Sequence, residues 1–309
     1  MKLKWGSIMS ETYLTRGLKC SLHGVYYQKL WLMLFFRRAV DRKDSFRLAT
    51  EMDSAAGFDD IVFRYKQNGV TVDTLIQIKH KENNSEKICV SDLLTRSGKF
   101  DLAKHFSASL KIQSNEEFKG ERKDFFFVTN ADFDYADLAS KKIIVKKIWM
   151  QDDFLSIGNG SGYKLIDYGG KIAEYLKKNK IFINDKLGRE DDEEIHDEEI
   201  KDFLNELVFV VNLPDDDELE ELIKNEISND LTGRFQYFGD DNFVFNALST
   251  MISNWMKESE GHFLTPEEGR EFFREVEKLP STLSEIKFIV TRAQRKVDEI
   301  VGGRQRLKK

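Results

Sequence analysis

Cysteine is scarce in this chain of 309 residues, which contains only Cys20 and Cys89. Their spacing matches no cysteine-based metal motif, and two cysteines in a chain of this length do not make a disulfide framework. We interpret both as free thiols and expect a reducing, intracellular location, either cytoplasmic or nuclear. This excludes a small secreted domain held together by disulfides.

Long hydrophobic runs are also missing. The first 17 residues contain no apolar segment of signal-peptide length, and the most apolar run, residues 30–36, ends at Arg37 and Arg38. That run is too short to span a bilayer, so we expect no membrane association. The glycine-rich residues 158–162 lack the GxxxxGK[ST] pattern and are interpreted as a flexible turn. No internal repeat or coiled-coil heptad is present.

What the chain does contain is a globular composition with an uneven charge. Apolar residues make up 40% and charged residues 33% of the sequence, and the length suits one large or two medium domains. Residues 1–189 hold 33 Lys and Arg against 24 Asp and Glu, whereas residues 190–309 hold 15 against 30. A basic half and an acidic half are typical of a nucleic-acid enzyme with a regulatory or partner-binding module, although ordinary surface charge would give similar numbers.

Residues 51–79 predict a β-hairpin. Two apolar runs, residues 61–63 and 75–78, flank a polar turn at residues 66–69 that contains Gly69. Side chains alternate along a strand, so Gln77 and Lys79 point to one face of the sheet. Asp59 and Asp60 directly precede the first run, and Glu51 lies upstream, where we expect the end of a helix. Oxygen donors and one lysine should therefore meet at one end of the hairpin.

This order of residues resembles the PD-(D/E)xK, or restriction-endonuclease-like, nuclease superfamily. The resemblance makes Glu51 the helix acid, Asp60 the acid that opens the second core strand (with Asp59 as the alternative), and Gln77 and Lys79 the pair on the third strand. Glutamine in place of the usual acid is similar to the Mrr-like branch. The flanking residues 51–53, 58–62 and 77–80 are similar to the nuclease domain at the start of many defence proteins, where NTPase modules or ankyrin repeats often follow.

The resemblance implies a restriction-endonuclease-like α/β fold, with a mixed central sheet flanked by helices. It also implies a phosphodiester hydrolase that uses Mg²⁺ or Mn²⁺. Carboxylate and amide oxygens suit such hard cations. Glu51, Asp60 and Gln77 would hold the metal, and Lys79 would orient the attacking water and stabilise the pentavalent phosphorane. A neutral Gln77 should make metal affinity lower than a set of three acids would. A turn before an edge strand with a solvated face would produce the same short motif.

Other residues are candidates for supporting roles. In the resembled subgroup a helix glutamine often faces the active site, which would be Gln28 here, whereas a hydrogen bond inside the core would also explain it. We expect His80 to support the strand end or to face a phosphate there, without binding metal. We interpret His23 as capping or hydrogen-bonding inside the core and His105 as a packing residue. Arg96, Lys99 and Lys104 lie on an expected helix and either contact a nucleic-acid backbone or form a solvated face.

Hydrophobic periodicity predicts the remaining elements. A helix over residues 22–40 is apolar nearly all round and should pack against the sheet, and residues 124–130, with three consecutive phenylalanines, predict a central buried strand. Further strands are expected at residues 143–148 and 163–168, and helices at residues 90–110, 172–178, 200–211, 215–227, 242–256 and 266–279. Residues 281–296 give no clear pattern, and residues 305–309 form a basic tail.

We therefore expect a nuclease-like domain over residues 1–189 and an acidic, all-helical domain over residues 190–309. The favoured function is metal-dependent cleavage of DNA with little sequence specificity, in a defence-type effector whose helical half binds a regulatory protein or a second copy. The alternative is a weak or inactive nuclease fold that binds nucleic acid or protein. No base-reading motif is present, which is why we expect little sequence specificity. The sequence does not distinguish double-stranded DNA from single-stranded DNA or RNA as the substrate.

Overall fold

The structure is a computed structural model that describes residues 18–43, 45–81, 86–120, 122–150, 154–155, 161–229, 241–258 and 261–277. Side chains are described from Leu22 onward, so the prediction that Cys20 is a free thiol lies outside the described residues. The expectations for residues 281–296 and 305–309, and for most of the glycine-rich loop, fall outside the described residues.

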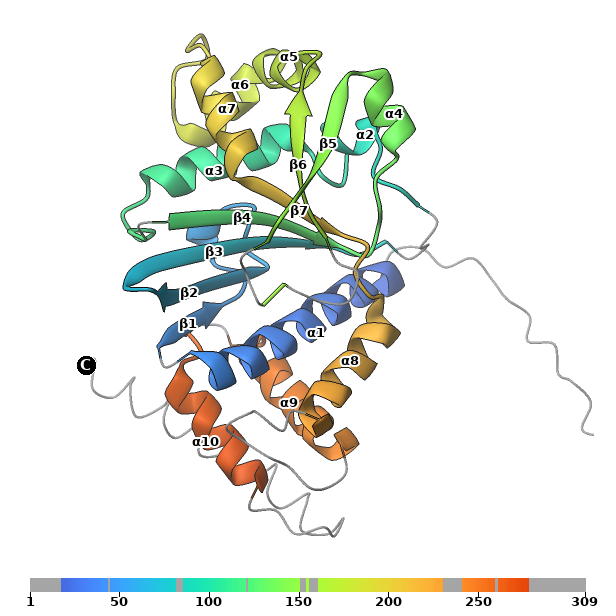
Figure 1. The fold of residues 1–309 in the computed structure, drawn as a ribbon. Coiled ribbons are helices and arrows are strands. Elements are labelled where there is room, and N and C mark those ends of the chain that lie inside the picture. Colours follow the sequence, from blue (N-terminus) through green and yellow to red (C-terminus); the bar gives the residue numbers. More distant parts are fainter. Residues whose placement is uncertain are drawn as a thin grey trace, which may run out of the picture.

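One mixed sheet runs through the described part of the chain in the order β1-β2-β3-β4-β7-β6-β5 (Figure 1). Its seven strands are β1 (Phe46–Ala49), β2 (Ile61–Gln67), β3 (Val70–Lys79), β4 (Arg122–Thr129), β5 (Ile143–Ile148), β6 (Ser161–Asp167) and β7 (Leu207–Val211). The first three strands form an antiparallel meander, β4 and β7 add in parallel, and β6 and β5 return antiparallel. The expected α/β class with a mixed central sheet is confirmed.

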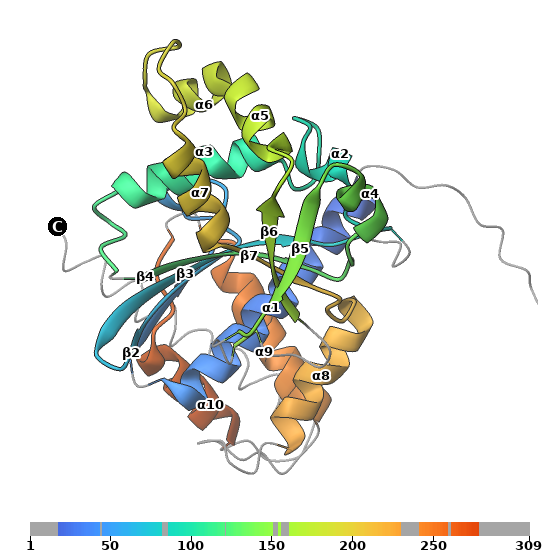
Figure 2. The same cartoon turned by 45° about the horizontal axis from the view of Figure 1, so that its top comes forward.

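Helices cover both faces of this sheet. They are α1 (Leu18–Arg42), the short 3-10 helix η1 (Asp53–Ala55), α2 (Val90–Leu93), α3 (Leu102–Ser114), α4 (Tyr135–Ser140), α5 (Lys171–Lys178), α6 (Lys180–Leu187), α7 (Asp197–Glu206), α8 (Asp216–Asn229), α9 (Asp241–Trp255) and α10 (Pro266–Glu277). Figures 1 and 2 show α3, α5, α6 and α7 on one face and α1, α8, α9 and α10 on the other. None of the described helices has the length and apolar character needed to cross a membrane.

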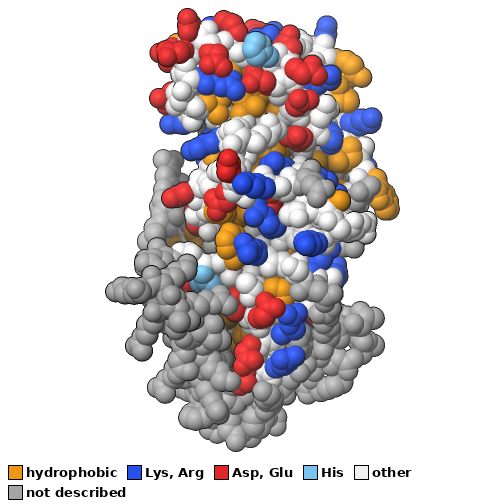
Figure 3. Space-filling view, turned by 90° about the vertical axis from the view of Figure 1, so that its left-hand side faces the viewer, with side chains coloured by type: hydrophobic (Ala, Val, Ile, Leu, Met, Phe, Trp, Pro, Cys, Tyr) orange, Lys and Arg blue, Asp and Glu red, His pale blue; other side chains and the backbone are white. Residues whose placement is uncertain are grey.

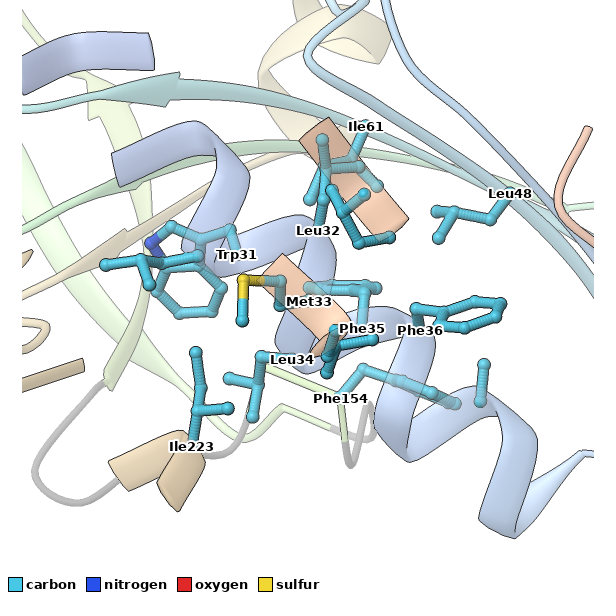
Figure 4. Packing of buried hydrophobic residues seen from close by; sticks show 14 of the residues in the cluster. Trp31, Leu32, Met33, Leu34, Phe35, Phe36, Leu48, Ile61, Phe154 and Ile223 are labelled. Atoms are coloured by element: carbon cyan, nitrogen blue, oxygen red, sulfur yellow. The ribbon is translucent and has the colours of Figure 1, made fainter. Parts of the chain in front are cut away.

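Helix α1 is buried between the sheet and the C-terminal helices, as its all-round apolar sequence predicts. Every side chain from residue 30 to residue 36 is fully buried. Figure 4 shows this run packed against Leu48 and Ile61 of the sheet and against Ile223 of α8. Because one helix contacts both layers, the sheet and α8–α10 share a single hydrophobic core.

The opposite core is built around aromatic side chains of β4. Phe127 contacts Phe58, Phe100 and Phe209, with ring centroids 4.9–5.7 Å apart. These rings come from a loop, from the segment before α3 and from β7, so β4 is covered on this face by residues distant in sequence. The prediction of a central buried strand is confirmed, since β4 pairs with β3 and β7.

The hairpin is also confirmed. β2 and β3 pair antiparallel from Ile61 opposite Ile76 to Gln67 opposite Val70. Asn68 and Gly69 turn the chain with φ angles of 54° and 84°. Positive φ at both central residues matches the right-handed twist of the flanking strands, which is why Asn-Gly favours this turn.

Two helix predictions need correction. The expected helix at residues 90–110 is divided into α2 and α3, because the chain turns at Gly98, where a Cβ would lie 2.2 Å from the Asp92 carbonyl oxygen. Asp101 then caps α3 by accepting the Ala103 N–H at 3.0 Å. The expected helix at residues 200–211 ends at Glu206. Residues 207–211, a leucine followed by three valines and one phenylalanine, form β7 and are buried at all five positions.

The predicted division at residue 190 is contradicted by the same strand. β7 pairs with β4 on one side and with β6 on the other. Residues 190–309 are therefore not an all-helical domain: they supply an inner strand of the sheet that residues 1–189 begin. The charged run that suggested a linker leads into α7, which packs on the α3 face.

Candidate functional site

The loop between β1 and β2 positions Glu51, Asp59 and Asp60. Glu51 follows β1 almost directly, so the expectation that it ends a helix is wrong; α1 is followed by a strand before this residue. Its φ of 52° is left-handed, which costs a non-glycine residue about 1–2 kcal/mol. The Glu51 N–H donates to the Asp59 carbonyl at 2.7 Å and closes the loop. Phe58 anchors it among the rings of the α3-side core.

Asp60 and Gln77 meet directly, as their strand positions predict. Asp60 Oδ2 accepts the Ile78 N–H at 2.5 Å and an N–H of the Gln77 amide. Gln77 is buried, and it lies beside Phe127 of β4 on the α3 face. Burial raises the pKa of Asp60 to about 6, and the Asp59 charge adds to this, against the Ile78 N–H, the Lys79 ammonium and the Gln77 amide.

Gln28 joins α1 to the same loop. Its Nε2 donates to Glu51 Oε1 at 3.0 Å, to Thr50 Oγ1 at 3.1 Å and, at a longer 3.4 Å, to the Asp60 carbonyl. Thr50 Oγ1 in turn donates to the Asp60 carbonyl at 2.8 Å. The position of Gln28 agrees with both interpretations. It is buried and hydrogen-bonded, and one of its partners is the candidate acid Glu51.

Lys79 and Asp59 complete the cluster electrostatically. Burial lowers the pKa of Lys79, while Asp60, Asp59 and Glu51 act in the opposite direction. Burial also raises the pKa of Asp59, with the Glu51 charge adding to it and Lys104 and Lys79 opposing it. Lys79 thus lies within electrostatic reach of Asp60, Asp59 and Glu51, and Gln77 contacts Asp60 directly. Asp60 is the acid bonded to Gln77, which favours it over Asp59 as the strand acid.

The three expected backbone-binding cations separate into two groups. Lys104 of α3 is exposed beside the cluster and acts on both Asp59 and Lys79. Arg96 instead pairs with Asp101 and stacks on Phe182, its guanidinium carbon 3.4 Å from the ring centroid. Lys99 lies 3.6 Å from a Glu86 carboxylate oxygen. Of the three, Lys104 is the one the fold places at the site.

The three histidines considered in the sequence have neighbours other than the candidate acids Glu51, Asp59 and Asp60. His80 stacks on Tyr27 at 4.7 Å, and its Nε2 lies 3.9 Å from an Asp216 oxygen, so it braces the strand end against α1 and α8. His105 packs edge-on to Phe58 and Phe127, as expected of a packing residue, and burial lowers its pKa well below the usual range. His23 is not in the core: it is exposed and contacts Asp216 at 3.2 Å.

The donor set fits Mg²⁺ or Mn²⁺ by its chemistry. Two carboxylates and one amide supply hard oxygen donors, and a cation would offset the cost of burying the charged forms of Asp59 and Asp60, whose pKa values burial raises. Among the described residues, no group of three or more His, Cys, Asp and Glu side chains is arranged to hold a metal. Glu51, Asp60 and Gln77 would do so only with the amide oxygen of Gln77 turned towards the ion.

Sequence analysis missed Thr50, whose hydroxyl connects Gln28 to the Asp60 backbone. The one available signal was its position directly before Glu51. It also missed a cavity of about 410 Å³ that is lined by Glu51 and by Asp53, Trp255 and His262, among other residues. The end of α9 and the segment after it supply part of the cavity wall, and the expected division into two domains concealed this.

Comparison with known proteins gives limited results. No protein-family model matches the chain, and no curated protein matches it. Two solved structures of the Acinetobacter baumannii Cap4 SAVED/CARF-domain containing receptor are similar to it at 11% identity. The one with the cyclic trinucleotide 3'3'3'-cAAA has a TM-score of 0.42, and the one with 2'3'3'-cAAA has 0.39. Each match covers 84% of this chain and 45% of the receptor, so the chain spans less than half the receptor's length.

Proposed function

We propose that this protein is a metal-dependent endonuclease that hydrolyses phosphodiester bonds of DNA with little sequence specificity. The observation that carries the proposal is the contact of Asp60 with Gln77, beside Lys79, which lies within electrostatic reach of both Asp60 and Glu51. The four residues were selected by their resemblance to the nuclease superfamily, and three of them lie together at one end of the hairpin.

The succession of elements supports the same proposal. A buried helix, a three-stranded meander, a second helix and a parallel strand follow one another as α1, β1, β2, β3, α3 and β4. This is a mixed central sheet flanked by helices, as a restriction-endonuclease-like core requires. The site lies where β3 ends and β2 begins, with Lys104 of α3 above it.

Each residue has a distinct role in the proposed hydrolysis. Mg²⁺ would supply charge neutralisation at the scissile phosphate. Glu51, Asp60 and the Gln77 oxygen would hold it, and the cation would lower the raised pKa of Asp60. Burial lowers the pKa of Lys79, which brings its ammonium closer to the range where it can exchange a proton with water. Lys104 would contact a phosphate from the exposed face of α3.

A second candidate function, binding without cleavage, is favoured by one specific contact. The Gln77 amide donates an N–H to Asp60, so the two groups satisfy each other instead of presenting two oxygens to a cation. A protein that keeps this arrangement in the presence of Mg²⁺ would hold nucleic acid or a protein partner without cutting.

Plasmid cleavage separates the two candidates. Purified protein is incubated with supercoiled DNA in Mg²⁺, Mn²⁺ or EDTA, beside Asp60→Ala, Lys79→Ala and the control Lys99→Ala, which changes a cation away from the cluster. The nuclease is supported if wild type and the control variant nick the plasmid in a metal-dependent way and both site variants do not. Equal, metal-independent inactivity of all proteins, with DNA binding intact, supports the binding module.

The regulatory partner or second copy expected through the C-terminal helices is part of this proposal. The apolar stripes of α8, α9 and α10 pack against α1 and the sheet, so a partner would contact their outer faces, which are charged on α8 and α10. Such contacts weaken with salt. Sedimentation at low and high salt tests this, and a monomer under all conditions would count against it.

A further inference from the structure

Trp149, directly after β5, is the most exposed large apolar side chain among the described residues, with 90% of its surface accessible. A single exposed apolar residue is ordinary on a protein surface. Trp149 differs because it lines a cavity of about 520 Å³ at the start of β4 and β7, and the proposed catalytic residues do not line this cavity. An indole at the mouth of a polar cavity offers a flat surface for stacking.

Positive charge surrounds this cavity. Arg122, Lys123 and Lys164 line it together with Asp124 and Glu206. Arg122 and Asp124 neutralise each other through hydrogen bonds of 2.6–3.1 Å. Glu206 accepts the Gln113 amide at 2.6 Å and lies within electrostatic reach of Lys123. Lys123 and Lys164 together outweigh this one carboxylate, so the cavity carries an excess of positive charge.

The lysines near Trp149 form no close ion pair in the described part of the chain, although Lys123 acts electrostatically on Glu206. Lys164 donates to the neutral Asn205 carbonyl. Lys123, Lys146 and Lys147 form no ion pair within the described part of the chain. Figure 3, which views the side of the molecule where β4 begins, shows Lys and Arg side chains gathered over the middle of this face.

The strand register adds an independent indication of an anion. Lys146 of β5 lies directly opposite Lys164 of β6. Like charges in a cross-strand pair repel each other and destabilise the sheet. Alternation places Ile148 on the same face as Lys146, and Ile148 and Lys164 both line the cavity. A phosphate beside this pair would convert the repulsion into attraction.

We propose that the cavity beside Trp149 binds single-stranded nucleic acid, with a base stacked on the indole and the adjoining phosphates held by Lys123, Lys146 and Lys164. Stacking with cationic contacts to the backbone is how proteins hold unpaired strands without reading sequence. A base within a duplex is already stacked on its neighbours, so Trp149 should add less binding free energy for duplex DNA than for a single strand. This proposal adds a substrate class to the proposed nuclease function. Cleavage of a single strand rests on that function, whereas binding of a single strand does not.

Binding in EDTA tests the proposal without any requirement for cleavage. Anisotropy of a short fluorescein-labelled oligothymidylate is measured with the full chain, Trp149→Ala, Trp149→Phe and Tyr168→Ala. Tyr168 is the matched control, because it is an aromatic residue with 75% exposure that does not line the cavity. We expect Trp149→Ala to weaken binding by about tenfold or more, Trp149→Phe to retain most of it, and Tyr168→Ala to leave it unchanged.

Salt dependence provides a second readout. Lys164→Gln should weaken binding and reduce the slope of log affinity against log salt by about 0.7, the value for one lost single-strand phosphate contact. The proposal is overturned if wild type does not bind the oligonucleotide, if Trp149→Ala binds like Tyr168→Ala, or if Trp149→Ala weakens duplex binding equally. If Trp149→Ala loses oligonucleotide binding while wild type fails to cleave the plasmid, the binding site is supported and the nuclease function is rejected.

Discussion

At Asp60, burial outweighs every local interaction that favours the carboxylate. Its pKa rises to about 6, whereas the unfolded chain titrates near 3.8. The folded state therefore binds the proton more tightly between these values, and the free energy of unfolding falls as pH rises through this window. Above pH 6 the penalty is complete, at about 3 kcal/mol for a shift of roughly two pKa units.

Asp60→Asn should therefore stabilise the protein in neutral solution. The amide keeps an acceptor for the Ile78 N–H and removes the buried charge, so we expect a gain of about 2 kcal/mol at pH 8 that disappears by pH 4. Urea denaturation at pH 4, 6 and 8 measures it, with the exposed Asp53→Asn as control. A difference that does not change with pH would show that burial does not control this carboxyl group.

Gln77→Glu tests whether the pair accepts a cation. The change places two carboxyl groups in direct contact, so the variant should lose about 1–3 kcal/mol of stability at pH 8 in EDTA. Mg²⁺ should restore stability if the two acids hold the ion, through binding to the folded state alone. The swap variant Asp60→Asn with Gln77→Glu keeps one amide and one acid and should need no metal. Equal stability of Gln77→Glu in EDTA and Mg²⁺ would contradict the metal site.

Strand alternation explains why Asp60, Gln77 and Lys79 could be selected from sequence. Their relative positions follow from two strands and one turn, which local residues determine. Glu51 was selected correctly as a neighbour of the cluster but assigned to the wrong element. Its position depends on a left-handed φ and on a hydrogen bond from Gln28, which is on α1. Tertiary contacts of this kind leave no local pattern in the sequence.

At the scale of elements, β7 shows where periodicity alone fails. Residues 200–211 are apolar at many successive positions, and a short apolar run fits a buried helix and a buried strand equally well. The β-branched Val208, Val210 and Val211 favoured a strand, but the acidic, helical residues before them extended the helix prediction. The partner that decides the outcome is β4, whose nearest residue lies nearly 80 positions away.

Gly269 is where two helices approach too closely for any side chain. A Cβ on this residue of α10 would fall 2.1 Å from Val40 Cγ2 and 3.1 Å from Phe36 Cζ, both on α1. Val40 is buried and β-branched, so it has little freedom to move. We expect Gly269→Ala to lower the free energy of unfolding by about 1–3 kcal/mol.

Gly24→Ala is the matched control for this variant. It changes a glycine of α1 that has no atom within 4 Å of the new Cβ, so helix propensity alone should act and stabilise the protein by up to about 1 kcal/mol. Chemical denaturation of both variants measures the contrast. A Gly269→Ala protein as stable as wild type would mean that α10 does not pack against α1 in this way.

At the scale of the whole molecule, the contrast between a basic and an acidic half does not separate two folding units. The acidic half supplies β7 to the interior of the sheet and α8–α10 to the core around α1. Charge patterning describes the surface, whereas the fold is determined by buried residues of both halves. Composition could therefore predict a difference between the two halves but not where the hydrophobic core is shared.

The shared sheet predicts that residues 1–189 will not fold alone. Without β7, the edge of β4 and the rings of Phe125 and Phe127 lose their cover, and the β5–β6 hairpin loses its only attachment within the described sheet. We expect this fragment to aggregate and to show no cooperative unfolding, while the full chain unfolds in one transition. Circular dichroism and calorimetry measure both, and a folded fragment would support the two-domain interpretation.

Phe209→Ala in the full chain tests the same point without truncation. Phe209 is fully buried in β7 and contacts Phe127 with ring centroids 4.9 Å apart. Its loss should lower the free energy of unfolding by about 3–5 kcal/mol. If both halves form one cooperative unit, the single transition moves to lower temperature as a whole. Two transitions, of which only one moves, would mean that the halves unfold separately and that β7 does not connect their stabilities.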